Sequence, residues 1–368
     1  MAKKLTQQQL NRATLARQLL LERHGMTPLR AIEQLAGMQA QLPRPPFVGL
    51  WSRLVGFRRE QLTRLLHNRK VVRATMMRCT IHLMSTKEYL ALRSAVQPAL
   101  TRAMHSALRK RADSLDVDRS VATARRYLQD EPHTFEQLRG HLKQLDPKCD
   151  ERACAFAVRT HLPLAMVPTD AAWGYPAAAS FTPADSWIGK PVPIADPRPD
   201  ALVRRYLGAF GPASVADAQS WSGLSGLREV FEEMRPKLRV FADERGRELF
   251  DLPKAPLPSA RTKAPVRFLP DYDNLVLAHD DRSRLMRDGD RRRICLPNLR
   301  VQPTFLVDGM VGGTWKIERA KKSATLVITP FASVAKAARA ELEAEGTALM
   351  QFVEPDAAKQ TVRFARPG

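Results

Sequence analysis

The feature that most constrains the fold of this chain is a run of three helical segments followed by a strand–turn–strand pattern. It is clearest between residues 201 and 253, where Gly211-Pro212 stops the first helix and Glu244-Arg245-Gly246 forms a tight turn between two strand-like stretches. Three helices followed by a hairpin form the plan of a winged helix. The segments expected here are helices over residues 201–211, 214–223 and 224–238 and strands over residues 238–243 and 247–253.

The same plan recurs twice before residue 200. In the first copy, Thr27-Pro28 provides an N-cap and a proline at the first helical position. Two short strands are expected around Arg78-Cys79, and Thr134 is the expected N-cap in the second copy. The first copy has helices expected at residues 5–24, 28–36, 47–55 and 59–67 and strands within 71–84. The second has two helices within 118–145, one at 150–160 and an apolar stretch at 162–168.

We therefore expect an α+β chain with three tandem winged-helix units and a β-rich C-terminal domain. Residues 253–265 are rich in proline, alanine and lysine, as in a linker. Beyond them, β-forming stretches that include residues 291–296 lead to one more expected helix at 333–346. A small barrel or sandwich capped by a helix fits this pattern. The expected boundaries are 1–115, 116–195 and 196–258 for the winged-helix units and 259–368 for the barrel-like domain.

The charge of the chain indicates a polyanionic partner. Among 368 residues, 59 Lys and Arg face 38 Asp and Glu, a net charge of +21. Nucleic acid is favoured over a membrane surface, and a generically basic protein is the alternative. No run of about eighteen apolar residues is present, the N-terminus lacks the apolar core of a secretory signal, and the four cysteines are scattered. These features predict a cytoplasmic protein, associated with the nucleoid if DNA is the partner.

Two neutral amides, Gln39 and Gln41, stand where the second helix should end. The stretch LAGMQAQLPRPP (35–46) has Gly37 as a plausible C-cap, and its prolines prevent the helix from continuing. On a helix, side chains two residues apart diverge, whereas on an extended segment they share a face. We therefore predict that residues 38–42 are non-helical and that the two amides lie side by side.

Several segments together resemble the family of winged-helix DNA glycosylases that contains AlkZ. The resemblance implies three winged-helix units in a C shape with a basic concave face, and hydrolysis of the bond between deoxyribose and an alkylated base. One branch of the family carries Gln–apolar–Gln and is associated with bulky adducts and crosslinks, and Gln39-Ala40-Gln41 matches that branch. The segments that carry the resemblance are GMQAQ (37–41), RATMMRCTIHLM (73–84), YLGAFGPASVADAQSWSGL (206–224), LPDYDNLVLAHDDRSRL (269–285) and PTFLVDGMVGGTW (303–315).

The chemistry of an alkylated base agrees with two amides as catalytic groups. Alkylation at guanine N7 makes the base cationic, so it departs without a strong general acid. A glutamine oxygen can accept a hydrogen bond from the attacking water and can face the positive charge that develops on the sugar. The alternative is that Gln39 and Gln41 only cap a helix end.

Basic side chains near the motif are the candidate DNA contacts. Arg44 is suited to hold a phosphate bidentately. Arg73 and Arg78 either hold phosphates or lie on a solvated strand face, and His82 either orients a phosphate or the water or is a structural histidine. Residues 282–300 predict a basic β-hairpin that turns at Asp288-Gly289 and approaches the duplex, or else an ordinary solvated hairpin. The hairpin arginines proposed for DNA binding are Arg282, Arg284, Arg291, Arg292 and Arg293.

No metal site or cofactor is expected. Cys149, Cys154 and His161 are too irregularly spaced for zinc, and Asp271 and Asp273 fit a turn better than a carboxylate pair. The preferred function is a monofunctional, monomeric DNA glycosylase that acts on double-stranded DNA carrying alkylated bases, in repair or in resistance to a genotoxin. The alternatives are a winged-helix regulator without catalysis and a protein that sequesters adducts.

Overall fold

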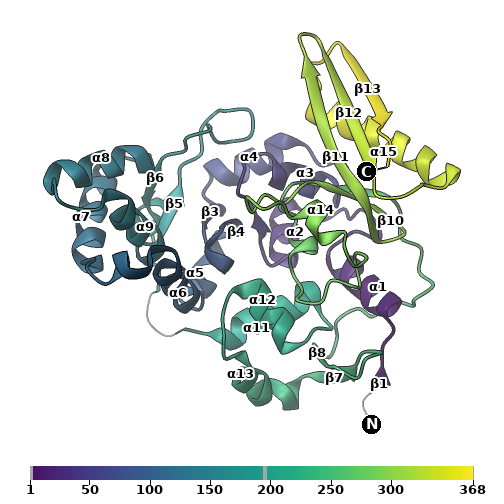
Figure 1. Ribbon diagram of the computed structural model, residues 1–368, viewed down its shortest axis with the longest axis horizontal. Coiled ribbons are helices and arrows are strands. Elements are labelled where there is room, and N and C mark those ends of the chain that lie inside the picture. Colours follow the sequence, from purple (N-terminus) through teal and green to yellow (C-terminus); the bar gives the residue numbers. More distant parts are fainter. Residues whose placement is uncertain (1–2, 194–196, 368) are drawn as a thin grey trace.

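Three separate β-sheets organise the described part of the chain, and helices pack around each of them (Figure 1). The computed structural model describes residues 3–193 and 197–367. One sheet has the strand order β2-β4-β3-β5-β6, a second has the order β1-β7-β8, and the third has the order β13-β12-β11-β10-β9. No helix in the described residues is both long and apolar enough to cross a membrane.

The N-terminal region forms the helices and the hairpin that the sequence predicts. Thr27 caps the second helix, with its side chain accepting from the Arg30 amide, and Pro28 occupies the first turn. The first helix ends before residue 24 because the chain reverses at Leu19, whose φ is 58°. The helices are α1 (Gln7–Arg17), α2 (Pro28–Gln34), α3 (Pro45–Trp51) and α4 (Arg59–His67), and the strands are β2 (Met38–Gln39), β3 (Val71–Thr75) and β4 (Ile81–Ser85).

The second region adds its strands to the sheet of the first. Ala165 of β5 pairs with Ala74 of β3, so one sheet contains strands from residues 1–115 and from residues 116–195. Thr134 caps α8 with a complete capping box, as its sequence predicts. The elements after β4 are α5 (Thr86–Leu92), α6 (Gln97–Leu108), α7 (Val117–Asp130), α8 (Phe135–Leu145), α9 (Glu151–His161), β5 (Leu164–Met166), β6 (Phe181–Pro183) and α10 (Ala184–Ile188).

The third region has three helices followed by an antiparallel hairpin, which confirms the predicted element order. The hairpin gains a third strand from the N-terminus, because β1 (Lys3–Lys4) runs parallel to β7. A fully buried ion pair between Arg17 and Asp251, at 2.6 Å, joins α1 to the end of this hairpin. The elements are α11 (Pro199–Phe210), α12 (Val215–Ser222), α13 (Leu227–Met234), β7 (Arg239–Ala242) and β8 (Glu248–Asp251).

The C-terminal domain is an open sheet, so the prediction of a barrel is wrong. The edge strands β9 and β13 do not pair with each other. Helix α15 covers the sheet instead, and buries Leu342, Leu349 and Met350 in one cluster with Phe268 and Leu326. The elements are β9 (Arg267–Leu269), α14 (Arg291–Ile294), β10 (Thr304–Val307), β11 (Met310–Ala320), β12 (Ser323–Pro330), α15 (Lys336–Val353) and β13 (Lys359–Phe364).

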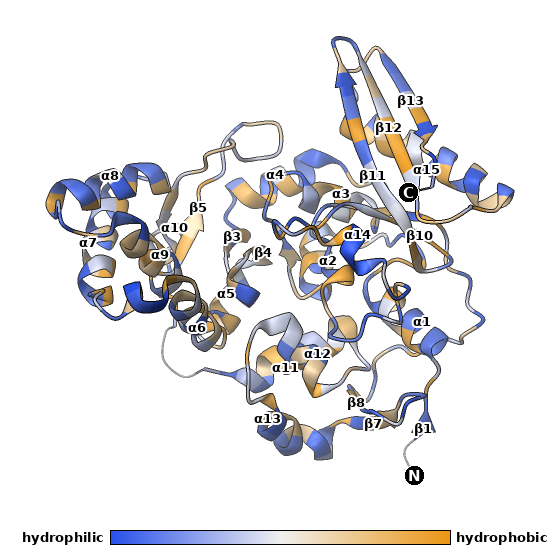
Figure 2. Cartoon of the chain, viewed as in Figure 1, coloured by the Kyte–Doolittle hydropathy of each residue, from blue (hydrophilic) through white to orange (hydrophobic). Residues whose placement is uncertain are grey.

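Apolar residues recur along these elements (orange in Figure 2), and buried clusters of them join the regions. The largest cluster combines residues of β3, α5 and α6 with α11, α12 and α13, so the first and third regions share a core. Tyr206, Phe210 and Trp221 pack against one another in it, with ring centroids 5.2 to 6.0 Å apart. This shared core places α12 beside the β3–β4 hairpin, where the amide motif is attached.

Candidate active site

The amide motif begins where α2 is forced to end. Ala36 and Gly37 both have positive φ, 54° and 83°, and the Gly37 amide donates to the Ile32 carbonyl oxygen at 3.0 Å. A Cβ on Gly37 would lie 2.1 Å from the Met84 sulfur, and the positive φ also disfavours a side chain, so glycine is strongly favoured here. Residues 38–42 are non-helical, as predicted, and Met38–Gln39 forms the edge strand β2 against β4. That the two amides lie side by side remains a prediction.

The Gln39 amide is held by an arginine from the β3–β4 hairpin. Arg78 Nη2 donates to Gln39 Oε1 at 2.8 Å, and Arg78 Nη1 donates to the Trp221 carbonyl oxygen at the end of α12. Burial lowers the pKa of Arg78 to about 10, so the guanidinium stays charged at neutral pH. Arg78 is therefore committed to Gln39 and Trp221 rather than to a phosphate. Gln39 Oε1 keeps a second lone pair for another donor.

A second arginine fixes the backbone of the motif. Arg73 Nε donates to the Ala40 carbonyl oxygen at 2.9 Å, and Arg73 Nη2 donates to that of Gln41 at 3.3 Å. Its guanidinium lies 4.6 Å from the centroid of the Tyr175 ring, and burial lowers its pKa to about 10. Gln41 Oε1 accepts from the Ile81 amide at 3.3 Å. Arg73 is only 3% exposed, so we leave it out of the proposed DNA contacts.

His82 lies directly across the sheet from Gln39. The two residues are paired in register, so their side chains project from the same face. His82 is fully buried, with Nδ1 3.1 Å from the Thr80 carbonyl oxygen. Burial, and then the charge of Arg78, lower its pKa to about 3. The imidazole is therefore neutral at physiological pH, and because it is fully buried we leave it out of the proposed phosphate contacts.

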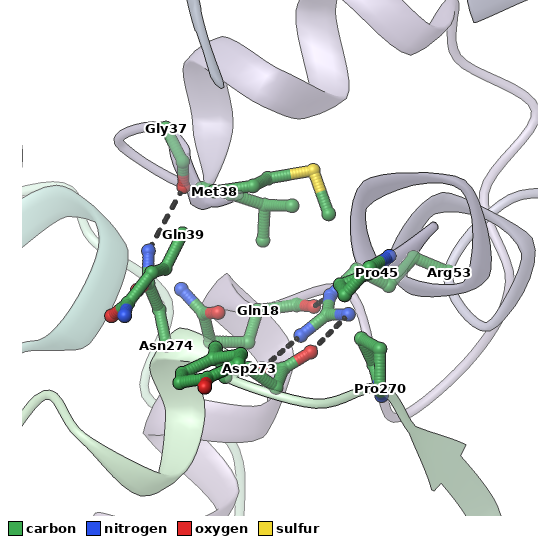
Figure 3. A pocket seen from close by; sticks show the side chains of 11 residues that line it. Gln18, Gly37, Met38, Gln39, Pro45, Arg53, Pro270, Asp273 and Asn274 are labelled. Carbon is green, nitrogen blue, oxygen red and sulfur yellow. Dashed lines mark hydrogen bonds and ion pairs between the residues drawn. The ribbon is translucent and has the colours of Figure 1, made fainter. Parts of the chain in front are cut away.

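A small pocket lies against Gln39 on the side of the C-terminal domain (Figure 3). Asn274 Nδ2 donates to the Gly37 carbonyl oxygen at 3.1 Å, and Arg53 makes a bidentate pair with Asp273, with both distances 2.9 Å. Asp273 Oδ1 also accepts from the Leu275 amide at 3.0 Å, in agreement with the predicted turn role. The residues that line the pocket include Gln18, Met38, Gln39, Arg53, Tyr272, Asp273 and Asn274.

Sequence reasoning did not identify Gln18, Arg53 or Asn274 as part of this site. Gln18 and Arg53 have no motif around them, and each is fully buried. Asn274 belongs to the PDYDN segment, which carries part of the family resemblance, but nothing in the sequence places that segment against Gly37. Residues that closely follow α1 and α3, together with Asn274 of the C-terminal domain, thus line the pocket beside Gln39.

Comparison with known proteins identifies the family. A family model described as DNA glycosylase AlkZ-like matches residues 32–352, which is most of the chain. This chain belongs to the AlkZ-like DNA glycosylase family. A curated interstrand DNA cross-link repair glycosylase of Streptomyces sahachiroi is 25% identical over 342 residues, 86% of this chain and 88% of that protein. The solved structure of the Streptomyces sahachiroi DNA glycosylase AlkZ covers 98% of this chain and is itself covered completely, with a TM-score of 0.78 and 21% identity.

The predicted basic hairpin of this AlkZ-like chain does not exist. Gly289 does turn, with φ 91°, but the residues on either side do not pair as strands. Leu285 and Ile294 are instead buried in a core cluster, and Arg291–Ile294 forms the short helix α14 where a strand was expected. Because Leu285 and Ile294 are buried by a turn and a short helix, this segment does not form the two paired strands of a hairpin.

The arginines of this segment fall into two groups. Arg284 is buried and donates to the Pro212 carbonyl oxygen at 2.9 Å and to Thr14 Oγ1 at 3.3 Å, so we leave it out of the proposed DNA contacts. Arg282 is half-buried and donates to the His279 carbonyl oxygen at 3.1 Å. Arg293 lies 3.8 Å from the Phe331 ring centroid. Arg291 and Arg292, by contrast, are exposed.

Arg44 stands at the far end of the motif, where α3 begins. Its guanidinium is 3.9 Å from the Asp271 carboxylate, and burial lowers its pKa. Arg300 approaches the same carboxylate at 3.6 Å. Two cations share one anion here, so a net positive charge remains beside the amides.

Proposed function

We propose that the chain hydrolyses the bond between deoxyribose and a cationic N-alkylated purine of the N7-alkylguanine type, with Gln39 and Gln41 as the catalytic residues. The observation that carries the proposal is the hydrogen bond from Arg78 to Gln39. It fixes the amide oxygen of Gln39 and leaves one of its lone pairs for the attacking water or the developing sugar cation. Such weak groups suffice when the base already carries a positive charge, and they leave undamaged bases intact.

Bulky and crosslinked adducts belong to the proposed substrate class. The Streptomyces sahachiroi relative is named as an interstrand DNA cross-link repair glycosylase. The resemblance of Gln39-Ala40-Gln41 to the Gln–apolar–Gln branch of the family implies such substrates as well. We infer either repair or resistance to a genotoxin as the biological role, with a monomeric enzyme acting at the nucleoid.

Three winged-helix units at residues 1–115, 116–195 and 196–258 are the proposed DNA-binding framework, in a C shape closed by residues 259–368. The three helices and hairpin of the third region support this division, as do α2, α3, α4 and the β3–β4 hairpin of the first. Arg44, Arg282, Arg291, Arg292 and Arg293 remain the proposed contacts to phosphates.

The test is release of an N7-alkylguanine from duplex DNA, with the abasic product detected by alkaline cleavage. The wild-type protein should release the base, whereas Gln39→Ala and Gln41→Ala should reduce release by about a hundredfold or more and keep duplex affinity. Gln97→Ala, on α6, is a matched control that removes an amide distant in sequence. If both motif variants released N7-alkylguanine as fast as the wild type, the amides would not be catalytic.

A further inference from the structure

Two exposed leucines, Leu42 and Leu299, belong to segments close to the proposed catalytic amides. In the described residues, the large hydrophobic side chains with high exposure are Leu42, Val55, Leu145 and Leu299. Leu42 directly follows Gln41. Leu299 is distant in sequence, but its neighbour Arg300 lies 3.6 Å from the Asp271 carboxylate that Arg44 also approaches. The Leu299 loop therefore lies beside the motif.

Leu299 is the most exposed of the four, at 85%, and its backbone is held in an unfavourable conformation. Its φ is 62°, a left-handed value that is unfavourable for a residue with a Cβ. Hydrogen bonds define the turn, since the Leu299 amide donates to the Leu296 carbonyl oxygen at 3.0 Å and the Leu296 amide donates to that of Arg300 at 2.9 Å. The turn thus presents an apolar tip outward.

The charges around this tip match a nucleic acid. Arg300 is exposed and Arg44 is half-buried, and the single carboxylate of Asp271 leaves a net positive charge between them. The Tyr272 amide donates to the Val301 carbonyl oxygen at 3.3 Å, which ties the end of the loop to the pocket beside Gln39. Figure 1 shows the chain after α14 leaving as a loop before it returns to β10.

We propose that Leu299 is a wedge that enters the base stack beside the damaged nucleotide, while Arg44 and Arg300 hold the phosphates on either side. Apolar side chains that enter between base steps unstack them, and contacts to the DNA backbone offset the cost. The opened stack gives Gln39 and Gln41 access to the sugar of the damaged base. This role rests on the proposed glycosylase function, and it assigns Leu299 a positioning role rather than a chemical one.

The first test measures unstacking directly. A duplex carries 2-aminopurine beside a tetrahydrofuran abasic analogue, and its fluorescence is read at saturating protein. Leu299→Gly suits the left-handed φ and removes the apolar side chain, and Leu299→Met keeps an apolar tip. Val55→Ala is a control at an exposed apolar residue outside residues 35–46 and 299. The wild type, Leu299→Met and Val55→Ala should brighten the probe, and Leu299→Gly should give a rise several times smaller. An equal rise with Leu299→Gly would overturn the proposal.

The second test asks where the wedge matters. Single-turnover release of N7-methylguanine should slow about tenfold in Leu299→Gly on a fully paired duplex, and clearly less when the lesion sits in a bulge that is already unstacked. Equal slowing on both substrates would mean a general disturbance of the site and would count against a wedge. If the wild type released no base, the proposed function would fail, but the fluorescence test would still decide the wedge.

Discussion

Arg78 connects Gln39 to the third helical region of the chain. One nitrogen of its guanidinium donates to the Gln39 amide oxygen at 2.8 Å, and another donates to the Trp221 carbonyl oxygen of α12. The orientation of the amide therefore depends on how the first and third regions pack together. The sequence suggests Arg78 as a phosphate contact, whereas in the structure it orients the proposed catalytic residue.

Arg78→Lys should reduce the rate of base release with little effect on binding. Lysine has one point of positive charge and cannot present two separated donors to Gln39 and Trp221 together. Because a misplaced catalytic group is costly, we expect kcat to fall about 10- to 100-fold and KM to change less than about threefold. Arg102→Lys is the matched control, because Arg102 also bridges to the α12–α13 turn but does not touch the motif. An unchanged kcat would remove Arg78 from the positioning of Gln39.

His82 should make the protein less stable as the pH falls below neutral. Its pKa is lowered from 6.5 to about 3 by burial, so between these values the unfolded chain binds a proton that the folded protein does not. The contribution of neutral His82 to the free energy of unfolding is fully present above pH 6.5. It falls by up to about 1.4 kcal/mol per pH unit as the pH drops toward 3.

His82→Gln removes this proton difference. The urea midpoint at pH 5 should then differ from that at pH 7 by less in the variant than in the wild type. His279, whose pKa burial also lowers to about 3, keeps part of the difference in both proteins. His105→Gln, at an exposed position of α6, is the control. An equal loss of stability with pH in the wild type and His82→Gln would show that His82 is not held neutral.

Gly37→Ala should destabilise the fold at the point where α2 gives way to the motif. A Cβ there would meet the Met84 sulfur at 2.1 Å, and the φ of 83° disfavours any side chain. We expect a loss of about 2–3 kcal/mol in the free energy of unfolding, measured by urea titration. Gly140→Ala is the control, since it lies within α8 with nothing within 4 Å of its Cβ position, and it should be neutral or slightly stabilising. Equal effects of the two changes would contradict this account.

The arginines of residues 282–300 should separate into DNA contacts and structural residues. Arg291→Gln and Arg292→Gln remove exposed charges, so each should weaken duplex binding and lower the slope of log K against log salt by up to about 1. Arg284→Gln instead leaves buried acceptors without a cationic donor and should lower the urea midpoint. A normal midpoint with a reduced salt slope in Arg284→Gln would reverse this assignment.

Much of the local structure could be read from the chain. The caps at Thr27 and Thr134, the β3–β4 hairpin and the hairpin after α13 follow from capping residues, β-branched runs and a glycine turn, all of which act within a few residues. The end of α2 before the motif also follows from local sequence. The wrong predictions concern segments whose structure depends on contacts with residues distant in sequence. The barrel fails because α15 covers the sheet, and the basic hairpin fails because Leu285 and Ile294 find a core to enter.

The sequence by itself determined that Gln39 and Gln41 lie on a non-helical segment, because glycine and proline restrict the backbone locally. It also determined the strongly positive net charge and the motifs by which the family is recognised. Only the tertiary structure decided which arginines are buried and engaged by other parts of the protein. Arg73, Arg78 and Arg284 are taken up by carbonyl and amide oxygens of segments far along the chain, and burial keeps His82 neutral. Those outcomes depend on packing between segments that are distant in sequence, and local sequence patterns do not predict such contacts.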